Sequence, residues 1–334
     1  MEKNLKKPIF IAEIASSHNG SVKDLNNFIK KIDSSKSIDL YKIQIFKNNN
    51  LCHVSSPLYK KLQKIEIAYP KWKKILSSIR NKQKLILEPF DKESFYFCKK
   101  LKKINKIKIP SAENQNNTLI LEAVKRFEEV YINVSGFSNK QILTFSNKYK
   151  KFKKKIIIMY GFQSYPTKFE DLRFKRIKFI CNQGFRTGYA DHSCYQDIGE
   201  TYISVINALK FGAVYIEKHI TPSIKKNLPD KISSFELKEF ENLIKNFAKL
   251  NNFDQKKDIS KSEIKYCQQM NKFAFTKNKI KKGEMFDLKK IIFLRSKIPG
   301  LSLDKINQMN KKKVLIYEKK IKKNSILRES FFKR

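Results

Sequence analysis

Short β-rich runs alternate with amphipathic stretches, and this alternation constrains the fold more than any other feature. Apolar residues recur at helical spacing between the runs, as in Val22–Ile32 and Phe95–Leu101. Eight such runs over about 220 residues predict an α/β fold of the (β/α)8 (TIM) barrel type. An open doubly wound sheet is the alternative. The runs are Ile9–Ile14, Leu40–Phe46, Lys84–Leu87, Lys106–Ile109, Val130–Val134, Ile156–Met159, Arg186–Ala190 and Ala213–His219.

Polar side chains stand at the C-terminal ends of nearly all the runs, and this favours the barrel over the open sheet. In the second run Lys42 and Gln44 alternate with apolar residues, so a period of two places both on one face. The ends of barrel strands converge on one rim, where active sites of this fold are built. The rim candidates are Glu13, Lys42, Gln44, Glu88, Lys108, Ser111, Glu113, Ser135, Gln163, Tyr165, Asp191, His192, Glu217 and His219.

Two of the four histidines, His192 and His219, end the seventh and eighth runs. On neighbouring strands they would lie side by side, and two neutral imidazoles could hold a divalent metal with positions open for substrate. His18 is either functional or a residue that stabilises its loop, and His53 is expected at the surface. Cys194 is interpreted as a buried free thiol rather than a metal ligand.

The chain of 334 residues, 41% of them hydrophobic, fits one large domain and one small domain. We predict a barrel over residues 1–250, a linker over 251–270 and a compact unit over 271–334. Short β-like runs in this last unit are Phe273–Thr276, Ile291–Leu294 and Lys313–Tyr317. About 60 residues make a marginal core, so the unit is expected to dock on the barrel or on a partner subunit.

The net charge of +41 comes from 72 Lys and Arg against 31 Asp and Glu. Lysine is spread along the chain with no localised basic stripe, so we interpret the charge as compositional drift and expect no nucleic-acid partner. No apolar run is long enough to span a membrane, and the N-terminus lacks a signal-peptide pattern. With five scattered cysteines, these features predict a cytoplasmic protein with reduced thiols.

The polar strand ends form an ordered set of motifs that resembles the sialic acid (N-acetylneuraminate) synthase family. That family includes the legionaminate, pseudaminate and spore-coat polysaccharide synthases. Residues Ile280–Glu284 of the tail resemble the small antifreeze-like (SAF) domain found in the family. The motifs are Ile11–Ile14 with His18–Gly20, Tyr41–Gln44, Lys108–Glu113, Tyr165–Thr167, Gly188–Ser193 and Glu217–His219.

The resemblance implies a transferase that condenses phosphoenolpyruvate with an N-acetylated amino sugar. The sugar would be N-acetylmannosamine or a related 2,4-diacetamido hexose, and the products a nonulosonic acid and phosphate. A divalent metal, typically Mn²⁺, would serve as cofactor. The resemblance also implies a homodimer in which the C-terminal domain is swapped and covers the partner's site.

The resemblance further assigns roles to individual residues. Three carboxylates would be catalytic: Glu13, Glu113 and Glu217. The metal would lie on His192 and His219. The substrate-binding residues would be Lys42, Gln44, Lys108, Ser111, Ser135, Gln163, Tyr165, Asp230 and Arg295, the last reaching the partner's sugar.

Three positions depart from the family pattern: Glu88, Val134 and Ala190. Hydroxyl groups common in the family are absent at Val134 and Ala190, and Glu88 adds a negative charge near anionic substrates. These changes would either redirect the sugar specificity or reduce activity. The alternative function is therefore a non-catalytic sugar- or anion-binding derivative of such a synthase.

Overall fold

The computed structural model describes residues 7–251, 259–312 and 314–333. Contacts divide the chain into two compact units, Met1–Phe253 and Asp254–Arg334. Of the predicted linker, residues 252–258 lie outside the described part, and Lys261–Met270 form helix α11. A capping box between Ser260 and Glu263 begins this helix.

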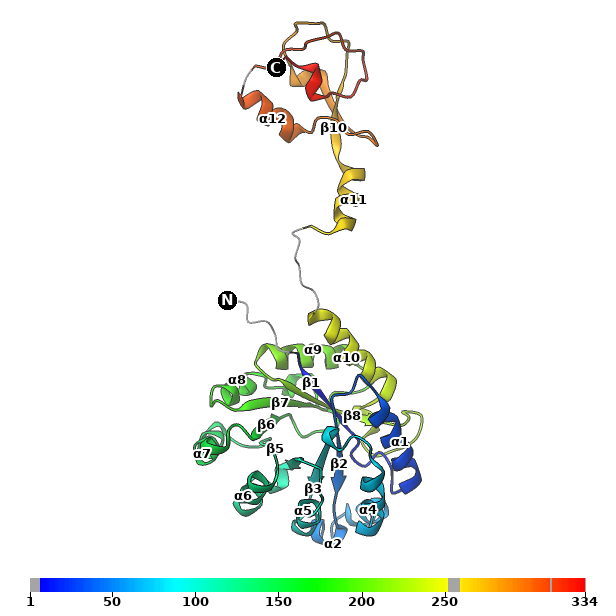
Figure 1. The fold of residues 1–334 in the computed structure, drawn as a ribbon, viewed down its shortest axis with the longest axis vertical. Coiled ribbons are helices and arrows are strands. Elements are labelled where there is room, and N and C mark those ends of the chain that lie inside the picture. Colours follow the sequence, from blue (N-terminus) through cyan, green and yellow to red (C-terminus); the bar gives the residue numbers. More distant parts are fainter. Residues whose placement is uncertain (1–6, 252–258, 313, 334) are drawn as a thin grey trace. The chain divides into compact units, whose positions relative to one another are not determined.

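The first unit is a closed barrel of eight parallel strands, as the alternation predicted (Figure 1). Pairing of β1 with β8 closes the sheet, and a short ninth strand pairs with the end of β8. Every predicted run is a strand, with its ends displaced by at most two residues. The strands are β1 Ile9–Glu13, β2 Leu40–Ile45, β3 Leu85–Pro89, β4 Lys106–Ile109, β5 Glu129–Asn133, β6 Ile156–Tyr160, β7 Arg186–Asp191, β8 Tyr215–Thr221 and β9 Ser234–Glu236.

Helices surround the barrel strands (Figure 1). Several of these helices begin after a residue whose side chain caps the first turn. At the start of α1, for example, the Ser21 side chain accepts a hydrogen bond from the Asp24 backbone N–H. The predicted helices Val22–Ile32 and Phe95–Leu101 correspond to α1 and α5. The helices of this unit are α1 Val22–Ser34, α2 Asn48–Leu51, α3 Tyr59–Ile65, α4 Tyr69–Ser78, α5 Lys92–Lys99, α6 Asn117–Arg126, α7 Asn139–Tyr149, α8 Lys175–Cys181, α9 Ile198–Lys210 and α10 Leu237–Asn251.

The side chains inside the barrel form two chemically different layers. Apolar side chains such as Ile86 and Ile157 pack into one buried cluster with two tyrosines, Tyr131 and Tyr215. The polar side chains at the strand ends lie toward the opposite rim. The interior is therefore filled by apolar side chains on one side and lined by polar ones on the other, the usual division in this fold.

The second unit has its own small core and an antiparallel pair of strands, β10 Lys272–Thr276 and β11 Ile291–Arg295. Its core residues include Ala274, Leu301 and Leu327, and helix α12 covers Leu303–Lys312. The third predicted β-run is present as isolated bridges at Ile316 and Tyr317, while Lys313 lies outside the described residues. The SAF identity of the unit stays a prediction.

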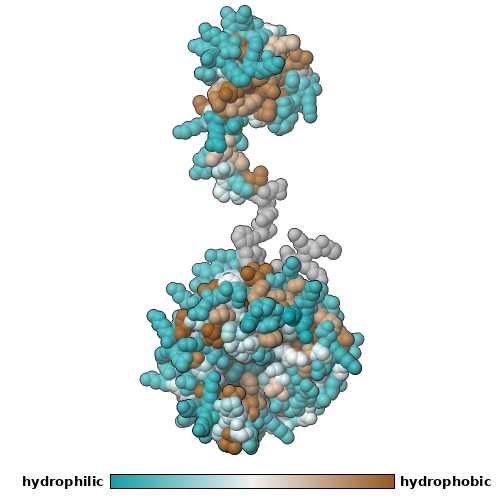
Figure 2. All heavy atoms as spheres, turned by 180° about the vertical axis from the view of Figure 1, so that it is seen from behind, coloured by the Kyte–Doolittle hydropathy of each residue, from teal (hydrophilic) through white to brown (hydrophobic). Residues whose placement is uncertain are grey.

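Hydrophilic side chains dominate the barrel face seen in Figure 2, as expected for lysine spread over the surface. Among the described residues, no helix is both long and apolar enough to cross a membrane. All five cysteines are free, and Cys194, which was expected to be buried, is only partly buried.

Candidate functional site

A cavity of about 80 Å³ lies at the C-terminal ends of the barrel strands. Nine of the predicted site residues line it, contributed by β2, β4 and β8 and by the segments that follow β4, β6 and β7. The nine are Lys42, Gln44, Lys108, Ser111, Gln163, Tyr165, His192, Glu217 and His219. The remaining lining residues are Glu88, Phe90, Pro110, Asn133 and Ala190.

Five buried charged side chains form one ion network beside this cavity, which we call the inner network: Glu13, Lys42, Glu88, Lys108 and Glu217. The Lys42 ammonium contacts three carboxylates, those of Glu13, Glu88 (2.5 Å) and Glu217 (3.1 Å). Lys108 donates to both Glu217 oxygens, at 2.7 and 2.9 Å, and lies 3.5 Å from Glu88. Three carboxylates thus share two ammonium groups.

Two members of the inner network, Glu217 and Lys108, hold their charged forms against the cost of burial, whereas burial lowers the pKa of Lys42. Burial by itself would raise the pKa of Glu217, but the charges of Lys108 and Lys42 outweigh it and lower that pKa. Burial would likewise lower the pKa of Lys108, and Glu217 and Glu88 reverse the effect. Both groups are therefore charged at neutral pH.

His192 and His219 lie side by side as predicted, with ring centroids 5.3 Å apart. Burial lowers the pKa of His192 to about 4 and that of His219 well below its usual value, so both rings are neutral at pH 7. The His192 Nδ1 donates to the Phe162 carbonyl oxygen at 2.8 Å, which leaves Nε2 with a free lone pair. The Tyr165 ring packs against both imidazoles, with centroids at 4.5 and 5.5 Å.

Several predicted site residues do not line the cavity. Glu13 is fully buried behind Lys42, where its Oε1 accepts the Ala15 backbone N–H. The carboxylate of Glu113 accepts a hydrogen bond from the Asn116 side chain at 2.8 Å. The Ser135 hydroxyl lies within hydrogen-bond distance of the Asn133 side chain and the Gly161 carbonyl oxygen.

The other two predicted substrate-binding residues, Asp230 and Arg295, do not line the cavity either. Asp230 caps the 3₁₀ turn Lys231–Ser233 with a left-handed backbone (φ 60°), and burial raises its pKa. The negative charge of Asp230 contributes to raising the pKa of Tyr165, which lines the cavity. Arg295 ends β11 in the second unit.

The sequence reasoning missed one buried pair on the opposite face of β8. Lys218 donates to Asp191 at 2.6 Å, and both side chains are fully buried. The Ser193 hydroxyl donates to the same carboxylate and lies 2.6 Å from the Thr201 hydroxyl. We call these four residues the outer network. Period-two alternation between Glu217 and His219 was the signal that could have placed Lys218 outside the barrel.

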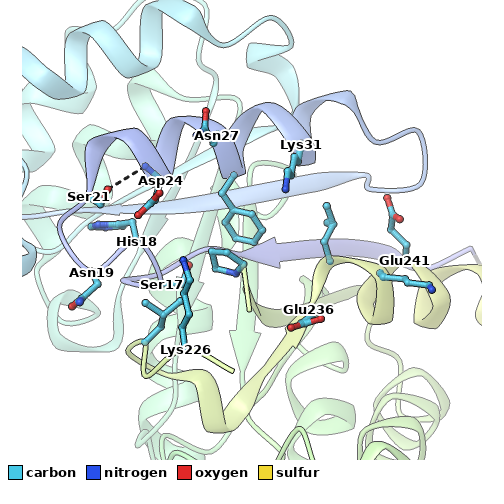
Figure 3. Close-up of a pocket in the computed structure, with 15 residues that line it drawn as sticks. Ser17, His18, Asn19, Ser21, Asp24, Asn27, Lys31, Lys226, Glu236 and Glu241 are labelled. Carbon is cyan, nitrogen blue, oxygen red and sulfur yellow. Dashed lines mark hydrogen bonds between the residues drawn. The ribbon is translucent and has the colours of Figure 1, made fainter. Parts of the chain in front are cut away.

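A larger cavity of about 640 Å³ shares no lining residue with the first (Figure 3). Its walls are α1, the loop after β1, the segment after β8 and the segment from β9 into α10. His18 belongs here; its Nδ1 accepts the Gly20 N–H at 3.0 Å, as a loop-stabilising role predicts. The smaller cavity is nevertheless the candidate site, because it alone joins the lysines, the carboxylates and the histidine pair.

The sequence and the fold are similar to those of known synthases. Over 305 residues the chain is 27% identical to an N,N'-diacetyllegionaminic acid synthase of Campylobacter jejuni, covering 84% of this chain and 88% of that protein. The fold matches an N-acetylneuraminic acid synthetase of Leptospira borgpetersenii, crystallised with citrate, with a TM-score of 0.65 and 22% identity over 80% of this chain and 93% of that one.

A second solved structure extends the likeness to nearly the whole chain. It is a putative spore coat polysaccharide biosynthesis protein E of Chromobacterium violaceum, with a TM-score of 0.63 and 20% identity over 98% of this chain and all of that one. Residues 30–259, most of the barrel, match the NeuB family. With its strand-end site and this match, the chain belongs to the NeuB family.

Proposed function

We propose that this protein is a sialic-acid-type synthase that condenses phosphoenolpyruvate with an N-acetylated amino sugar and releases phosphate. The observation that carries the proposal is a single cavity lined by two lysines and two neutral histidines at the rim of the barrel. Such a site can bind an anion and a carbonyl oxygen next to each other. N-acetylmannosamine and 2,4-diacetamido hexoses are the proposed sugars.

The anionic substrate would lie against Lys42 and Lys108. Phosphoenolpyruvate carries a phosphate and a carboxylate, and buried ammonium groups bind such oxygens with charge-assisted hydrogen bonds. Ser111 and Gln163 line the same cavity and supply neutral donors. This arrangement orients the enol carbon toward the histidines.

The residues present fit a divalent metal held by two protein ligands. His192 offers a free Nε2 whose ring orientation is fixed by the Phe162 carbonyl, and His219 lies beside it. In the part of the chain that the structure describes, no three His, Cys, Asp or Glu residues form a complete metal cage. Water and substrate oxygens would complete the coordination, and bound Mn²⁺ would supply Lewis-acid polarisation of the sugar aldehyde.

The reaction forms one carbon–carbon bond, forms one carbon–oxygen bond to water and breaks the carbon–oxygen bond to phosphate. The enol carbon attacks the sugar aldehyde, water adds to the resulting cation, and the tetrahedral intermediate expels phosphate to leave a keto acid. Glu217 is the proposed catalytic carboxylate that the cavity geometry supports most directly, since it lines the cavity. Glu13 would hold Lys42 in place, and Glu113 would act from the adjoining 3₁₀ turn.

The sugar would contact the outer part of the site. Gln44 and Tyr165 line the cavity and present an amide and a phenol to sugar hydroxyls. Asp230 would bind a further hydroxyl, and Ser135 would hold the loop that carries Gln163. Arg295 would act from the C-terminal unit of a partner subunit in a domain-swapped homodimer.

A second candidate function is a non-catalytic sugar- or anion-binding protein. It is motivated by the departures from the family pattern at Glu88, Val134 and Ala190, two of which, Glu88 and Ala190, line the cavity. Such a protein would bind phosphoenolpyruvate or the sugar tightly and release no phosphate.

The test is to incubate the protein with Mn²⁺, phosphoenolpyruvate and a panel of N-acetylated hexosamines that includes 2,4-diacetamido sugars. We expect phosphate release with at least one sugar and a product of the mass of a nonulosonic acid. His219→Ala should abolish turnover, whereas replacing His53, an exposed histidine that does not line the cavity, by alanine should retain it. No phosphate release with any sugar at high protein concentration would refute the proposal.

A further inference from the structure

Glu88 is an additional acid placed between the two cavity lysines. It lies on β3, between the strands that carry Lys42 and Lys108, and its backbone pairs with Gln44. Its Oε2 is 2.5 Å from Lys42 Nζ and its Oε1 is 3.5 Å from Lys108 Nζ. One carboxylate thus bridges the two ammonium groups, as an oxygen-bearing anionic substrate would.

The charges of the inner network do not balance. Three carboxylates, Glu13, Glu88 and Glu217, face two lysines, so the fully ionised network has a net charge of −1. The Lys42 ammonium donates to Glu88 and Glu217 and makes a further ion-pair contact with Glu13. An anion that entered the cavity with this arrangement unchanged would meet a like charge next to both lysines.

Among the three carboxylates, Glu88 is the one that an entering anion could displace most readily from the lysines. Glu13 is fully buried and accepts a backbone N–H, which fixes it in position. Glu217 binds Lys108 through both of its oxygens. Within the described part of the chain, the Glu88 carboxylate contacts only the two lysines, and its residue lines the cavity.

We propose that Glu88 is an internal anion that occupies the Lys42–Lys108 pair in the free protein and that the anionic substrate binds by displacing it. Glu88 is thereby the residue that sets the affinity of the site for anions. The identity of the substrate as phosphoenolpyruvate rests on the proposed function, but displacement of Glu88 by an anion does not.

The decisive experiment compares Glu88→Gln with the wild type by isothermal titration calorimetry. The probes are phosphoenolpyruvate, inorganic phosphate and uncharged N-acetylmannosamine. Glutamine keeps the shape of the side chain and leaves two carboxylates for two ammonium groups, so the network becomes neutral. We expect roughly tenfold or tighter binding of both anions, because a like charge at contact distance is removed. Affinity for the neutral sugar should change much less.

Glu122→Gln is the matched control, because Glu122 also pairs with a lysine, Lys99, at 2.7 Å but lies outside the cavity. Its anion affinity should equal that of the wild type. Glu88→Thr provides a second variant that removes the charge, and thermal unfolding checks that each protein is folded. If the folded Glu88 variants bind anions no more tightly than the wild type, the inference is wrong.

The outcomes separate this inference from the proposed function. Turnover by the wild type with unchanged anion affinity in both Glu88 variants would overturn the inference and leave the synthase proposal standing. Tighter anion binding by the variants, with no phosphate release from any protein, would support the inference and refute the synthase proposal.

Discussion

Strand β8 carries a buried ion network on each of its two faces, and the two networks differ in their charge balance. Lys218 points out of the barrel and joins the outer network, where one ammonium meets one carboxylate and both are fully buried. Glu217 and His219 point inward, and there three carboxylates share two ammonium groups beside a cavity. Adjacent residues of one strand therefore serve two different environments.

The difference separates a structural role from a functional one. In the outer network every charge has a partner, and the Ser193 and Thr201 hydroxyls complete the hydrogen bonds. Such a sealed pair stabilises the connection between β7 and β8. The inner network keeps an excess of charge next to open space, an arrangement that favours binding and catalysis over stability.

The largest expected effect is on catalysis and comes from the inner network. Lys108→Met should lower phosphate release by about 10³-fold, because it removes a cation that would stabilise the substrate anion. Lys99→Met, which removes a lysine from an ion pair on the helices, should leave the rate unchanged. If the Lys108→Met variant retained wild-type activity, the functional assignment of the inner network would be wrong.

The outer network should contribute to the free energy of unfolding of the barrel. Asp191→Ala leaves the buried Lys218 ammonium without its carboxylate and should cost about 3–5 kcal/mol. Urea unfolding followed by fluorescence of the single tryptophan, Trp72, measures this in the barrel, since its side chain is buried there. The double variant Asp191→Leu with Lys218→Met should recover much of the loss. A double variant as unstable as the single one would contradict the role of a balanced pair.

A smaller effect is expected from His18, which lies outside both networks. Burial lowers its pKa to about 4, from 6.5 in the unfolded chain, so the unfolded state binds more protons between these values. Stability should therefore rise with pH from about 4 to 6.5 and fall as the pH is lowered through that range, by up to about 3 kcal/mol for this residue. His18→Gln should remove this part of the pH dependence of urea unfolding. An unchanged profile would show that His18 contributes nothing to acid sensitivity.

Much of the fold and part of the site follow from local pattern. The alternation of apolar runs and helical stretches predicted all eight barrel strands, because burial on both faces selects β-branched and other apolar residues locally. Period-two alternation placed Lys42 and Gln44 on one face of their strand, and the ends of the seventh and eighth runs placed His192 beside His219. Such patterns are short-range properties of the sequence. Nine of the residues that they indicated line one cavity in the structure.

The partners of those residues were decided by tertiary structure. Lys42 and Glu217 are 175 residues apart in sequence, and Lys108 and Glu217 are 109 apart, so no local pattern specifies which carboxylate meets which lysine. The same holds for the Ser135 hydroxyl, which contacts the Gly161 carbonyl oxygen and does not line the cavity. The sequence by itself determined the barrel and the chemical groups at its rim. Tertiary structure decided that Glu88 bridges two lysines and that Lys218 pairs with Asp191, because both arrangements depend on the pairing and register of neighbouring strands.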